Sequence, residues 1–395
     1  MCGITAVFGK KEDKEEFVKK SLNKIKHRGT SILEYRSFSN CALGANRLPI
    51  VDREYGVQPL SNQDETIFAV QNGEIFNYKE LMVNLKKKGY KFKTNSDTEV
   101  LAHLYEEYGE KLIDKIDSEM FAIIIYDKKK NKLFVARDRY GVKPLFYANE
   151  GDTYYFASEL KQLSQFKSID KIEVFPKGHY MLNGKLKKYY SLNSSNSEKN
   201  LEKTKHQLTK HIIEAVKKRV DTDLPIAVLL SGGVDSSLIM EIATRFHKDV
   251  TAFILGRPGA PDYEAAVKLC KDNNYTYQVV YPDVDYQKEL DQLIYHLELY
   301  EAQVIRQSFA LDILSKAVVR AGFRIALVGE AADEIFGGYN QFSALPSDQI
   351  NKGCVMMTND LERGHNIRVD RMSMKHTLET RAPFFDTKVV DYAMK

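Results

Sequence analysis

The spacing of apolar residues differs between the two halves of the chain. In the first half, short apolar segments rich in β-branched and aromatic residues are separated by turn residues, which predicts antiparallel strands. These segments are residues 4–8, 67–71, 121–126, 133–136, 145–147 and 154–157. Between them, residues 98–108 place Val100, Leu101, Leu104 and Tyr108 on one face, as a helix would. The first half is therefore predicted to be layered α and β.

In the second half the pattern alternates between strand and helix. A stripe at four-residue spacing from Leu208 to Val220 predicts a first helix. Strands are predicted at residues 226–230, 250–255, 276–281 and 325–328, and further helices at 236–246, 263–271, 290–300 and 309–320. Such alternation predicts a parallel sheet covered on both faces. Ligands bind beyond the carboxyl ends of the strands in such sheets. Ser231-Gly232-Gly233 and Gly329-Glu330 follow two of these strands, so both loops are expected at one site.

Between the halves the apolar pattern lapses. Residues 183–206 are rich in Lys, Ser and Asn, which is typical of an exposed connector. We therefore predict a first domain over residues 1–190, a linker over 191–206 and a second domain over 207–395.

Composition narrows the class of protein. The 395 residues predict two domains, and 43% hydrophobic with 28% charged residues is ordinary for a globular chain. A net charge of +4 with scattered lysines argues against nucleic-acid binding. Four cysteines without CxxC spacing indicate neither a metal site nor a disulfide framework, which fits the reducing cytoplasm. The apolar start is too short for a signal peptide, and no run is long enough to span a membrane. A homodimer is left open.

The most informative motif follows the predicted strand at 226–230. Adjacent Gly232 and Gly233 allow the backbone to approach an anion, and the next helix directs its free N–H groups at it. Ser231, Ser236 and Ser237 add hydroxyl donors, and Asp235 adds a metal ligand. The loop is predicted to bind pyrophosphate or the phosphates of a nucleotide.

A second motif lies at the amino terminus, where the chain opens Met1-Cys2-Gly3-Ile4. Removal of Met1 would give Cys2 both a thiol and a free α-amine, whose reference pKa values are about 8.5 and about 8. A nucleophile and a general base would then belong to one residue. The alternative is a small buried cysteine in the first strand.

Together, the motifs make the whole chain resemble the glutamine-hydrolysing asparagine synthetases. In the first half the matching strings are Met1-Cys2-Gly3-Ile4, residues 46–52 (NRLPIVD), 71–77 (QNGEIFN), 96–99 (SDTE) and 136–145 (ARDRYGVKPL). In the second half they are residues 230–237 (LSGGVDSS), 329–339 (GEAADEIFGGY), 370–373 (DRMS) and 379–384 (ETRAPF). The resemblance implies an Ntn-type α/β/β/α sandwich followed by a parallel doubly wound sheet of the ATP-pyrophosphatase type.

For the first half, the resemblance implies a class II glutamine amidotransferase. Cys2 would attack the side-chain amide of glutamine, and Asn72 with the Gly73 N–H would form the oxyanion hole. Arg47 would bind the α-carboxylate of glutamine, while Glu74 and Asp97 would bind its ammonium group. Asp97 also has the sequence position of a helix N-cap, and the two roles are compatible.

For the second half, the resemblance implies conversion of aspartate to asparagine through β-aspartyl-AMP, with ATP and Mg²⁺ required. Asp235 and Asp333 would share Mg²⁺, Glu330 would position or deprotonate ammonia, and Arg306 would lie near the acceptor. The residues expected to bind ATP are Leu230, Ser231, Gly232, Gly233, Asp235, Ser236, Ser237, Leu255 and Gly329. Without the resemblance, residues 329–334 would read as an acidic helix start after a buried strand.

Some positions depart from the family pattern. Arg28-Gly29-Thr30-Ser31 replaces the usual Arg-Gly-Pro-Asp, and Gln307-Ser308-Phe309 replaces a small-polar segment after Arg306. The chain also stops before the tail usual in the family, which carries a lysine expected to stabilise transition-state charge. The alternatives are therefore an amidotransferase for another carboxylate, an intramolecular amide ligase of the β-lactam synthetase type, a form with glutaminase activity alone, and a non-enzymatic binder. Retention of Cys2 and the glutamine-binding positions argues against the β-lactam type.

Overall fold

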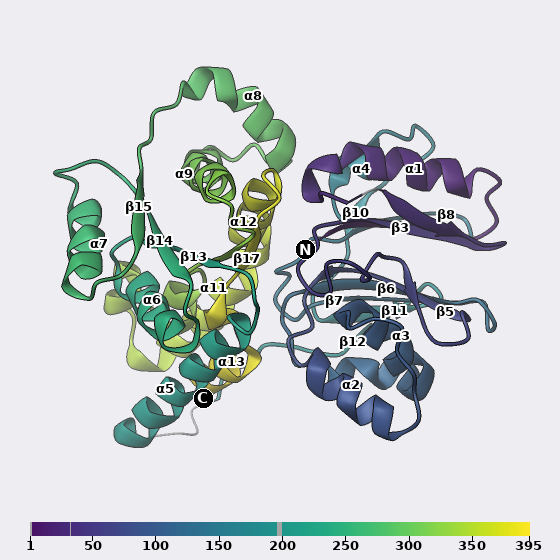
Figure 1. Cartoon of the computed structure of the whole chain (residues 1–395), viewed down its shortest axis with the longest axis horizontal. Coiled ribbons are helices and arrows are strands. Elements are labelled where there is room, and N and C mark those ends of the chain that lie inside the picture. Colours follow the sequence, from purple (N-terminus) through teal and green to yellow (C-terminus); the bar gives the residue numbers. More distant parts are fainter. Residues whose placement is uncertain (1, 32, 196–199) are drawn as a thin grey trace. The chain divides into compact units, whose positions relative to one another are not determined.

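The computed structural model describes residues 2–31, 33–195 and 200–395 of a chain that divides into two units, Met1–Ser191 and Leu192–Lys395 (Figure 1). Within the expected linker, residues 201–206 belong to a helix, α5 (Leu201–Arg219), because Asn200 caps it by accepting a hydrogen bond from the Lys203 N–H. Residues 196–199 of that linker lie outside the described residues.

The first unit is built on two six-stranded antiparallel sheets. Their strand orders are β10-β8-β9-β1-β3-β2 and β12-β11-β7-β6-β5-β4. The strands of the first sheet are β1 (Cys2–Phe8), β2 (Glu34–Ser37), β3 (Cys41–Arg47), β8 (Phe146–Glu150), β9 (Thr153–Ala157) and β10 (Glu173–Val174). Those of the second are β4 (Leu60–Ser61), β5 (Ile67–Gly73), β6 (Phe121–Asp127), β7 (Lys132–Arg137), β11 (His179–Leu182) and β12 (Lys185–Lys188).

Helices cover the outer faces of both sheets, so the unit is an α/β/β/α sandwich (Figure 1). The helices α1 (Lys14–Lys24) and α4 (Leu160–Ser164) lie on the first sheet, and α2 (Tyr78–Lys87) and α3 (Asp97–Tyr108) lie on the second. Two short 3₁₀ helices, η1 (Lys26–Arg28) and η2 (Gly109–Lys115), complete the unit.

Alternation along the strands separates the apolar core of this unit into layers, because successive side chains of a strand point to opposite faces. On β5, Phe68 and Val70 join the cluster that also holds Ile4 of β1 and lies between the sheets. Ala69 of the same strand belongs instead to the cluster with Leu101 of α3. The sheets are thus held face to face, with Cys2 in the layer between them.

The second unit contains a five-stranded sheet in the order β15-β14-β13-β16-β17, with every adjacent pair parallel. The predicted parallel sheet is therefore confirmed. Its strands are β13 (Ile226–Leu229), β14 (Val250–Leu255), β15 (Tyr277–Val280), β16 (Ile325–Leu327) and β17 (Glu379–Arg381). β17 was not predicted, because it has only three residues and its sequence, Glu-Thr-Arg, carries no apolar pattern.

Besides α5, the helices of this unit are α6 (Val234–Phe246), α7 (Pro261–Asp272), α8 (Tyr286–Leu297), α9 (Ala302–Arg320), α10 (Ala332–Phe336), α11 (Ser347–Asp360), α12 (His365–Met374) and α13 (Thr387–Ala393). Three 3₁₀ helices are η3 (Asn340–Ala344), η4 (Leu361–Arg363) and η5 (Pro383–Phe385).

The bounds of two predicted helices are wrong, and the one expected at 290–300 already begins at Tyr286. The helix expected at 290–300 ends at Leu297, because Glu298 adopts a left-handed conformation with φ 60° that terminates the helix. The helix expected at 309–320 begins at Ala302, seven residues before the apolar stripe used to predict it.

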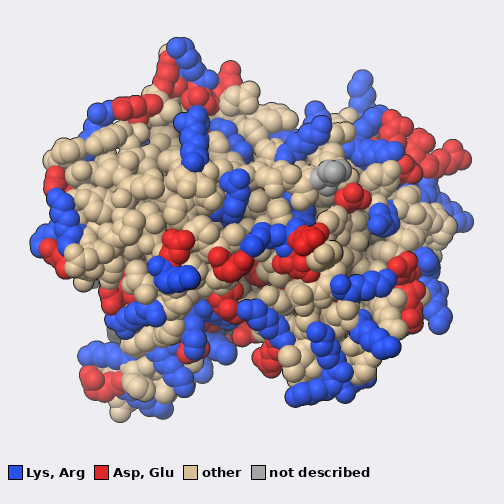
Figure 2. All heavy atoms as spheres, viewed as in Figure 1, with Lys and Arg blue, Asp and Glu red and all other residues tan. Residues whose placement is uncertain are grey.

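The charge distribution on the surface and the hydropathy of the helices agree with the composition. Lysine and arginine are mixed with acidic side chains over the face shown in Figure 2, without a single basic stripe. In the described part of the chain, no helix is both long enough and apolar enough to cross a membrane.

Candidate functional sites

Cys2 is the first residue of β1 and is almost completely buried, with 3% of its surface exposed. Its backbone N–H donates to the side-chain oxygen Oδ1 of Asn72 over 3.2 Å, and its carbonyl oxygen accepts from the Nε of Arg28 over 3.1 Å. Burial raises the pKa of the thiol, while the nearby Arg47 guanidinium opposes that rise. The backbone of Cys2 is therefore fixed on both sides, and ionisation of its thiol depends on the polar groups around it.

Asn72 is oriented by this contact. Because its Oδ1 accepts from the Cys2 N–H, its amide nitrogen Nδ2 points elsewhere, and this buried nitrogen has no hydrogen-bond partner among the described residues. An unpaired buried donor costs free energy, about 1–3 kcal/mol, unless a ligand accepts from it. Asn72 therefore carries a donor beside Cys2 that suits a developing oxyanion.

The next residue, Gly73, allows two backbone segments to approach closely. It has φ +140°, and a Cβ atom placed there would lie 2.0 Å from the carbonyl oxygen of Met120. Only glycine fits that space and that conformation. The Gly73 peptide, the other predicted oxyanion donor, is thus held at the end of β5 by its pairing with Phe121 on β6.

Arg47 is buried at the end of β3, where its register partner on β1 is Cys2. Its guanidinium donates to the backbone carbonyl oxygens of Val51, Asp52 and Arg53 over 2.5–3.3 Å. Burial lowers its pKa. A guanidinium has five N–H donors, so these three hydrogen bonds leave two donors for a ligand carboxylate.

Asp97 does not cap α3, so that part of the sequence prediction is wrong. Ser96 is the N-cap residue, because its hydroxyl accepts from the Thr98 N–H. The Oδ2 of Asp97 instead accepts from the side chain of Gln71 and from the Ile75 N–H, the latter over 3.1 Å. The carboxylate is thereby directed at the loop after β5.

Glu74 and Gln58 complete the polar surroundings of Cys2. Glu74 is 6% exposed and follows Gly73 directly. Gln58 is 4% exposed, and its amide nitrogen donates to the Cys2 sulfur over 3.5 Å. Sequence reasoning missed Gln58, because no motif marks a glutamine 56 residues from the cysteine that it contacts.

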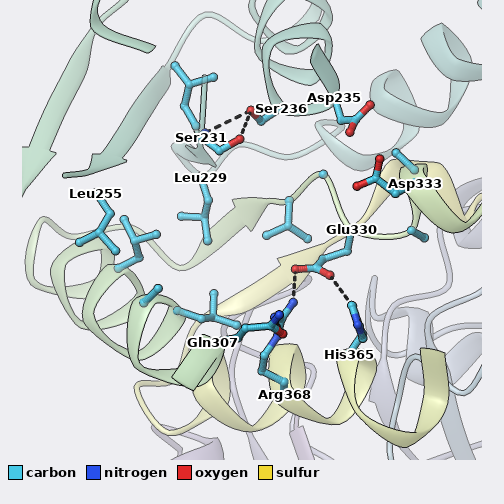
Figure 3. Close-up of a pocket in the computed structure, with 18 of the residues that line it drawn as sticks. Leu229, Ser231, Asp235, Ser236, Leu255, Gln307, Glu330, Asp333, His365 and Arg368 are labelled. Atoms are coloured by element: carbon cyan, nitrogen blue, oxygen red, sulfur yellow. Dashed lines mark hydrogen bonds and ion pairs between the residues drawn. The ribbon is translucent and has the colours of Figure 1, made fainter. Parts of the chain in front are cut away.

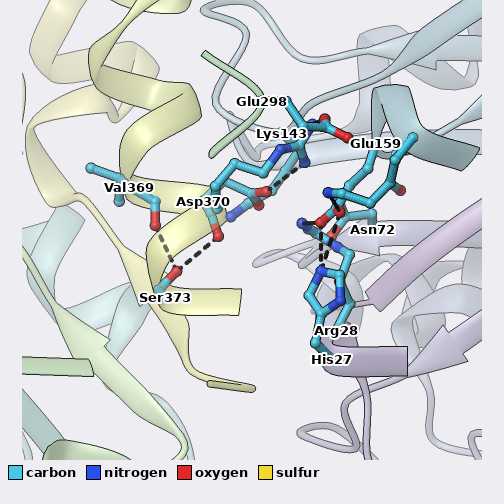
Figure 4. A network of polar contacts seen from close by, with 12 residues as sticks. His27, Arg28, Asn72, Lys143, Glu159, Glu298, Val369, Asp370 and Ser373 are labelled. Carbon is cyan, nitrogen blue, oxygen red and sulfur yellow. Dashed lines mark hydrogen bonds and ion pairs between the residues drawn. The ribbon is translucent and has the colours of Figure 1, made fainter. Parts of the chain in front are cut away.

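A buried charged network supports the strand that carries Cys2 (Figure 4). Arg28 is fully buried and pairs with Glu159 over 2.8 Å, while His27 and Lys161 also contact the Glu159 carboxylate. Since Arg28 also donates to the Cys2 carbonyl, the network fixes the position of β1.

In the second unit, Figure 4 shows the Ser373 hydroxyl donating to the Val369 carbonyl oxygen within α12.

The second unit contains a cavity of about 540 Å³ at the carboxyl ends of its parallel strands (Figure 3). The prediction that the loops after β13 and β16 face one site is confirmed. Lining residues include Leu229, Leu230, Ser231, Asp235, Ser236, Leu255, Gln307, Gly329, Glu330, Asp333, Glu334, His365 and Arg368.

The glycine-rich loop folds as a tight cradle before α6. Gly232 has φ +84°, and a Cβ atom there would lie 2.5 Å from the carbonyl oxygen of Asp262. The Ser231 N–H donates to the Ser236 hydroxyl over 3.1 Å, and the Ser237 hydroxyl donates to the Gly233 carbonyl over 2.7 Å. Ser231 and Ser236 line the cavity, whereas Gly232, Gly233 and Ser237 are not among its lining residues.

Two acidic side chains face one another beside this loop (Figure 3). Asp235, in the first turn of α6, has its pKa raised by burial and then by the charges of Asp333 and Glu334. Like charges held this close disfavour ionisation unless a cation neutralises them. Carboxylate oxygens are ligands suited to Mg²⁺, so the donor chemistry of Asp235 and Asp333 fits such an ion.

Glu330 also lines the cavity and is paired with basic side chains. Arg368 donates to it over 2.7 Å, and His365 Nδ1 lies 3.7 Å from its other oxygen. Burial alone would raise the pKa of Glu330, but His365 and Arg368 outweigh burial and lower it. Glu330 is consequently held as a carboxylate.

The acceptor side of the cavity differs from the prediction. Arg306 is exposed on α9 and is not among the cavity's lining residues, whereas its neighbour Gln307 is. The Oε1 of Gln307 accepts from Arg368 over 2.6 Å. Arg368 and His365 were missed, although Arg368 lies two residues before the matched string that begins at Asp370.

Comparison with known proteins places the chain in a family. A family model described as a glutamine amidotransferase domain matches residues 1–219, and one described as asparagine synthase matches residues 207–353 and 344–395. A probable glutamine-hydrolysing asparagine synthetase of Schizosaccharomyces pombe is 36% identical over all of this chain and 76% of that protein. The chain belongs to the glutamine-hydrolysing asparagine synthetase family.

Other members of the family are similarly related. Asparagine synthetase 2 of Oryza sativa is 33% identical and asparagine synthetase 3 of Arabidopsis thaliana is 34% identical, each over the whole of this chain, which covers 69% and 71% of them. A solved glutamine phosphoribosylpyrophosphate amidotransferase from B. subtilis shares 18% identity with a TM-score of 0.40, covering 85% of this chain and 77% of that one. That structural likeness is too low to support an argument.

The close approach at Gly73 gives a stability prediction. Gly73→Ala should lower the unfolding temperature of the first unit by about 8 °C or more, because the added methyl group meets the Met120 carbonyl in a strained conformation. The matched control is Gly89→Ala, where φ is +96° but no atom lies within 4 Å, and about 2–4 °C is expected. Differential scanning calorimetry of the full chain measures both, and equal losses would contradict the close approach.

Proposed function

We propose that the chain hydrolyses glutamine in its first unit and uses the ammonia, with ATP, to convert aspartate to asparagine in its second. The observation that carries this proposal is the second-unit cavity, which brings together the phosphate-type loop, two facing aspartates and the paired carboxylate Glu330. Membership of the family supports the same reaction.

In the first unit, Cys2 acts as the nucleophile once Met1, which lies outside the described residues, has been removed. The α-amine of Cys2 takes the thiol proton, and the thiolate attacks the side-chain carbon of glutamine. The oxyanion that forms accepts from Asn72 Nδ2 and the Gly73 N–H. The proton passes to the leaving nitrogen, ammonia departs, and water hydrolyses the thioester to glutamate.

Substrate binding in this unit uses the charged groups around Cys2. The two remaining donors of Arg47 suit the α-carboxylate of glutamine. Asp97 and Glu74 supply negative charge for its ammonium group. Opposite charges at the two ends fix which way the substrate enters.

In the second unit, the loop around Ser231 holds the ATP phosphates against the start of α6. The aspartate β-carboxylate attacks the α-phosphorus, so that pyrophosphate leaves and β-aspartyl-AMP forms. Ammonia then attacks the activated carbonyl carbon, and AMP leaves. Bound Mg²⁺, held by Asp235 and Asp333, would neutralise charge on the phosphates.

Glu330 is better suited to positioning ammonia than to deprotonating ammonium. His365 and Arg368 lower its pKa, which makes it a weak base but keeps it ionised as a hydrogen-bond acceptor. Arg368 in turn presents positive charge close to where an acceptor carboxylate would bind.

A second candidate is amide formation on a carboxylate other than aspartate. It is favoured by Gln307, which lines the cavity and engages Arg368 where Arg306 had been expected to meet the acceptor. Replacement of aspartate by other amino-acid carboxylates in a pyrophosphate-release assay distinguishes the two.

The cysteines support the proposal of a cytoplasmic location. All four cysteines are free and buried, which agrees with residence in a reducing cytoplasm. A homodimer stays a prediction.

Cys2→Ala tests whether glutamine hydrolysis takes place in the first unit and asparagine formation in the second. It should lower glutamine-supported asparagine formation by about a thousandfold or more, because the nucleophile is lost, and leave ammonia-supported formation within about twofold. The matched control is Cys41→Ala, the same change at a buried cysteine of β3 away from the proposed chemistry. Loss of both activities in a folded Cys2→Ala protein, with Cys41→Ala active, would contradict the proposal.

Asp235→Asn tests the nucleotide site. It should abolish cleavage of ATP to AMP and pyrophosphate while sparing glutamine hydrolysis, because one of the two facing carboxylates is removed. The raised pKa of Asp235 means that its ionised form opposes folding, an effect absent at low pH and present at neutral pH. Ligand-free melting at pH 7 should therefore be unchanged or higher by about 1–2 °C.

The control for this variant is Asp262→Asn, an exposed acidic residue that also lines the cavity. It should retain pyrophosphate release within about threefold, as expected for an exposed side chain. Cleavage of ATP to ADP and phosphate by the unaltered protein would show that the loop is assigned to the wrong reaction.

A further inference from the structure

Gln58 lies two residues before β4 and contacts the nucleophile directly. Its amide nitrogen Nε2 donates to the Cys2 sulfur over 3.5 Å, and its Oε1 accepts from the Gln71 backbone N–H over 2.7 Å. With 4% of its surface exposed, the side chain is inaccessible to bulk water. Both ends of one buried amide are therefore engaged, and one of them touches the reacting atom.

The orientation of this amide follows from its partner. A backbone N–H can only donate, so the atom of Gln58 that faces Gln71 must be the oxygen. The NH₂ group consequently faces Cys2, whose sulfur receives an N–H donor whichever protonation state it has. The strand β5 imposes this arrangement, since the Gln71 N–H belongs to its backbone.

A continuous chain of hydrogen bonds extends beyond Gln71. The Gln71 side chain donates to Asp97 Oδ2, which also accepts from the Ile75 N–H. The sulfur is thus linked through two glutamines to the carboxylate proposed to bind the substrate ammonium group. The side chains of Gln58, Gln71 and Asp97 cannot rotate without breaking a buried hydrogen bond.

Gln58 can affect how readily the Cys2 thiol ionises. Burial disfavours the thiolate, the charge of Arg47 and a hydrogen bond from the Leu48 backbone N–H favour it, and the charge of Asp97 opposes it. A hydrogen bond from an N–H group stabilises an anionic sulfur more than a neutral thiol. Gln58 therefore acts in the same direction as Arg47.

We propose that Gln58 is a catalytic residue of the glutaminase reaction, which donates a hydrogen bond to the Cys2 sulfur and stabilises the thiolate that forms when the α-amine takes the thiol proton. The inference rests on the proposed function of Cys2, but it concerns the thiol itself and is measurable without glutamine. Loss of the donor leaves the sulfur more basic, so fewer molecules carry a thiolate and each remaining thiolate is more nucleophilic.

The experiment is the rate of Cys2 alkylation by iodoacetamide as a function of pH, followed by mass spectrometry of the Cys2 peptide from the full chain. In Gln58→Ala the midpoint of the profile should rise by about one pH unit. The rate should fall about threefold below the midpoint and rise about threefold on the high-pH plateau, because nucleophilicity changes by only part of the change in basicity. A merely structural role would not produce this crossing of the two profiles.

Gln58→Glu is the second variant, in case Gln58→Ala does not fold. It keeps an oxygen for the Gln71 N–H but replaces the donor with an anion, so the midpoint should rise at least as far. The matched control is Asn62→Ala, which removes another fully buried amide, one that contacts Thr66 and Glu106 rather than Cys2. Its midpoint should equal that of the unaltered protein.

An unchanged midpoint in folded Gln58→Ala or Gln58→Glu would overturn the proposal, as would an equal shift in Asn62→Ala. Glutamate release from glutamine by the unaltered protein is measured separately. Its absence would refute the glutaminase assignment itself, whatever the alkylation profiles show.

Discussion

The hydrogen bond from the Cys2 N–H to Asn72 Oδ1 is the contact on which the first site depends. Cys2 begins β1 of one sheet, and Asn72 lies near the end of β5 in the other. The sandwich buries both residues between apolar layers, so each polar atom there must be paired or be kept for a ligand. Pairing the Asn72 oxygen with Cys2 leaves the Asn72 amide nitrogen for the substrate. Gly73 and Gln58 belong to the same arrangement, one through its close backbone approach and the other through its contact with sulfur.

The second site depends on a different constraint, the parallel register of β13 and β16. Because the two strands pair in parallel, the loops that follow them meet at one edge and bring Asp235 towards Asp333. Burial, and then the charge of Asp333, raises the pKa of Asp235, and a bound cation would relieve the repulsion between the two carboxylates. Glu330 follows β16, as Asp333 does, but Arg368 and His365 pair with Glu330 and keep it ionised. Neighbouring carboxylates in one cavity thus have opposite pKa shifts, which suits them to different tasks.

Features that depend on a short stretch of sequence, such as strands and the glycine-rich loop, could be predicted. Among the described residues, the apolar pattern indicated six of the twelve strands of the first unit and four of the five strands of the second. The glycine-rich loop was placed correctly after β13, because strand, turn and helix signals are adjacent in the chain. Contacts between distant residues carried no such signal. Gln58 reaches Cys2 across 56 residues, and Arg368 reaches Glu330 across 38, so neither pairing was visible in any string. Asp97 was given a capping role that belongs to Ser96, because both types of residue cap helices and only the hydrogen bond distinguishes them.

In this enzyme, one chain couples ATP cleavage to amide formation on aspartate. The most direct measurement is pyrophosphate release from MgATP by the purified 395-residue chain with glutamine as nitrogen donor, with and without aspartate, together with analysis of the amino acids formed. We expect pyrophosphate release that requires aspartate, with one asparagine and one AMP formed for each pyrophosphate. Glutamate release without pyrophosphate, or pyrophosphate release that is indifferent to aspartate, would contradict it.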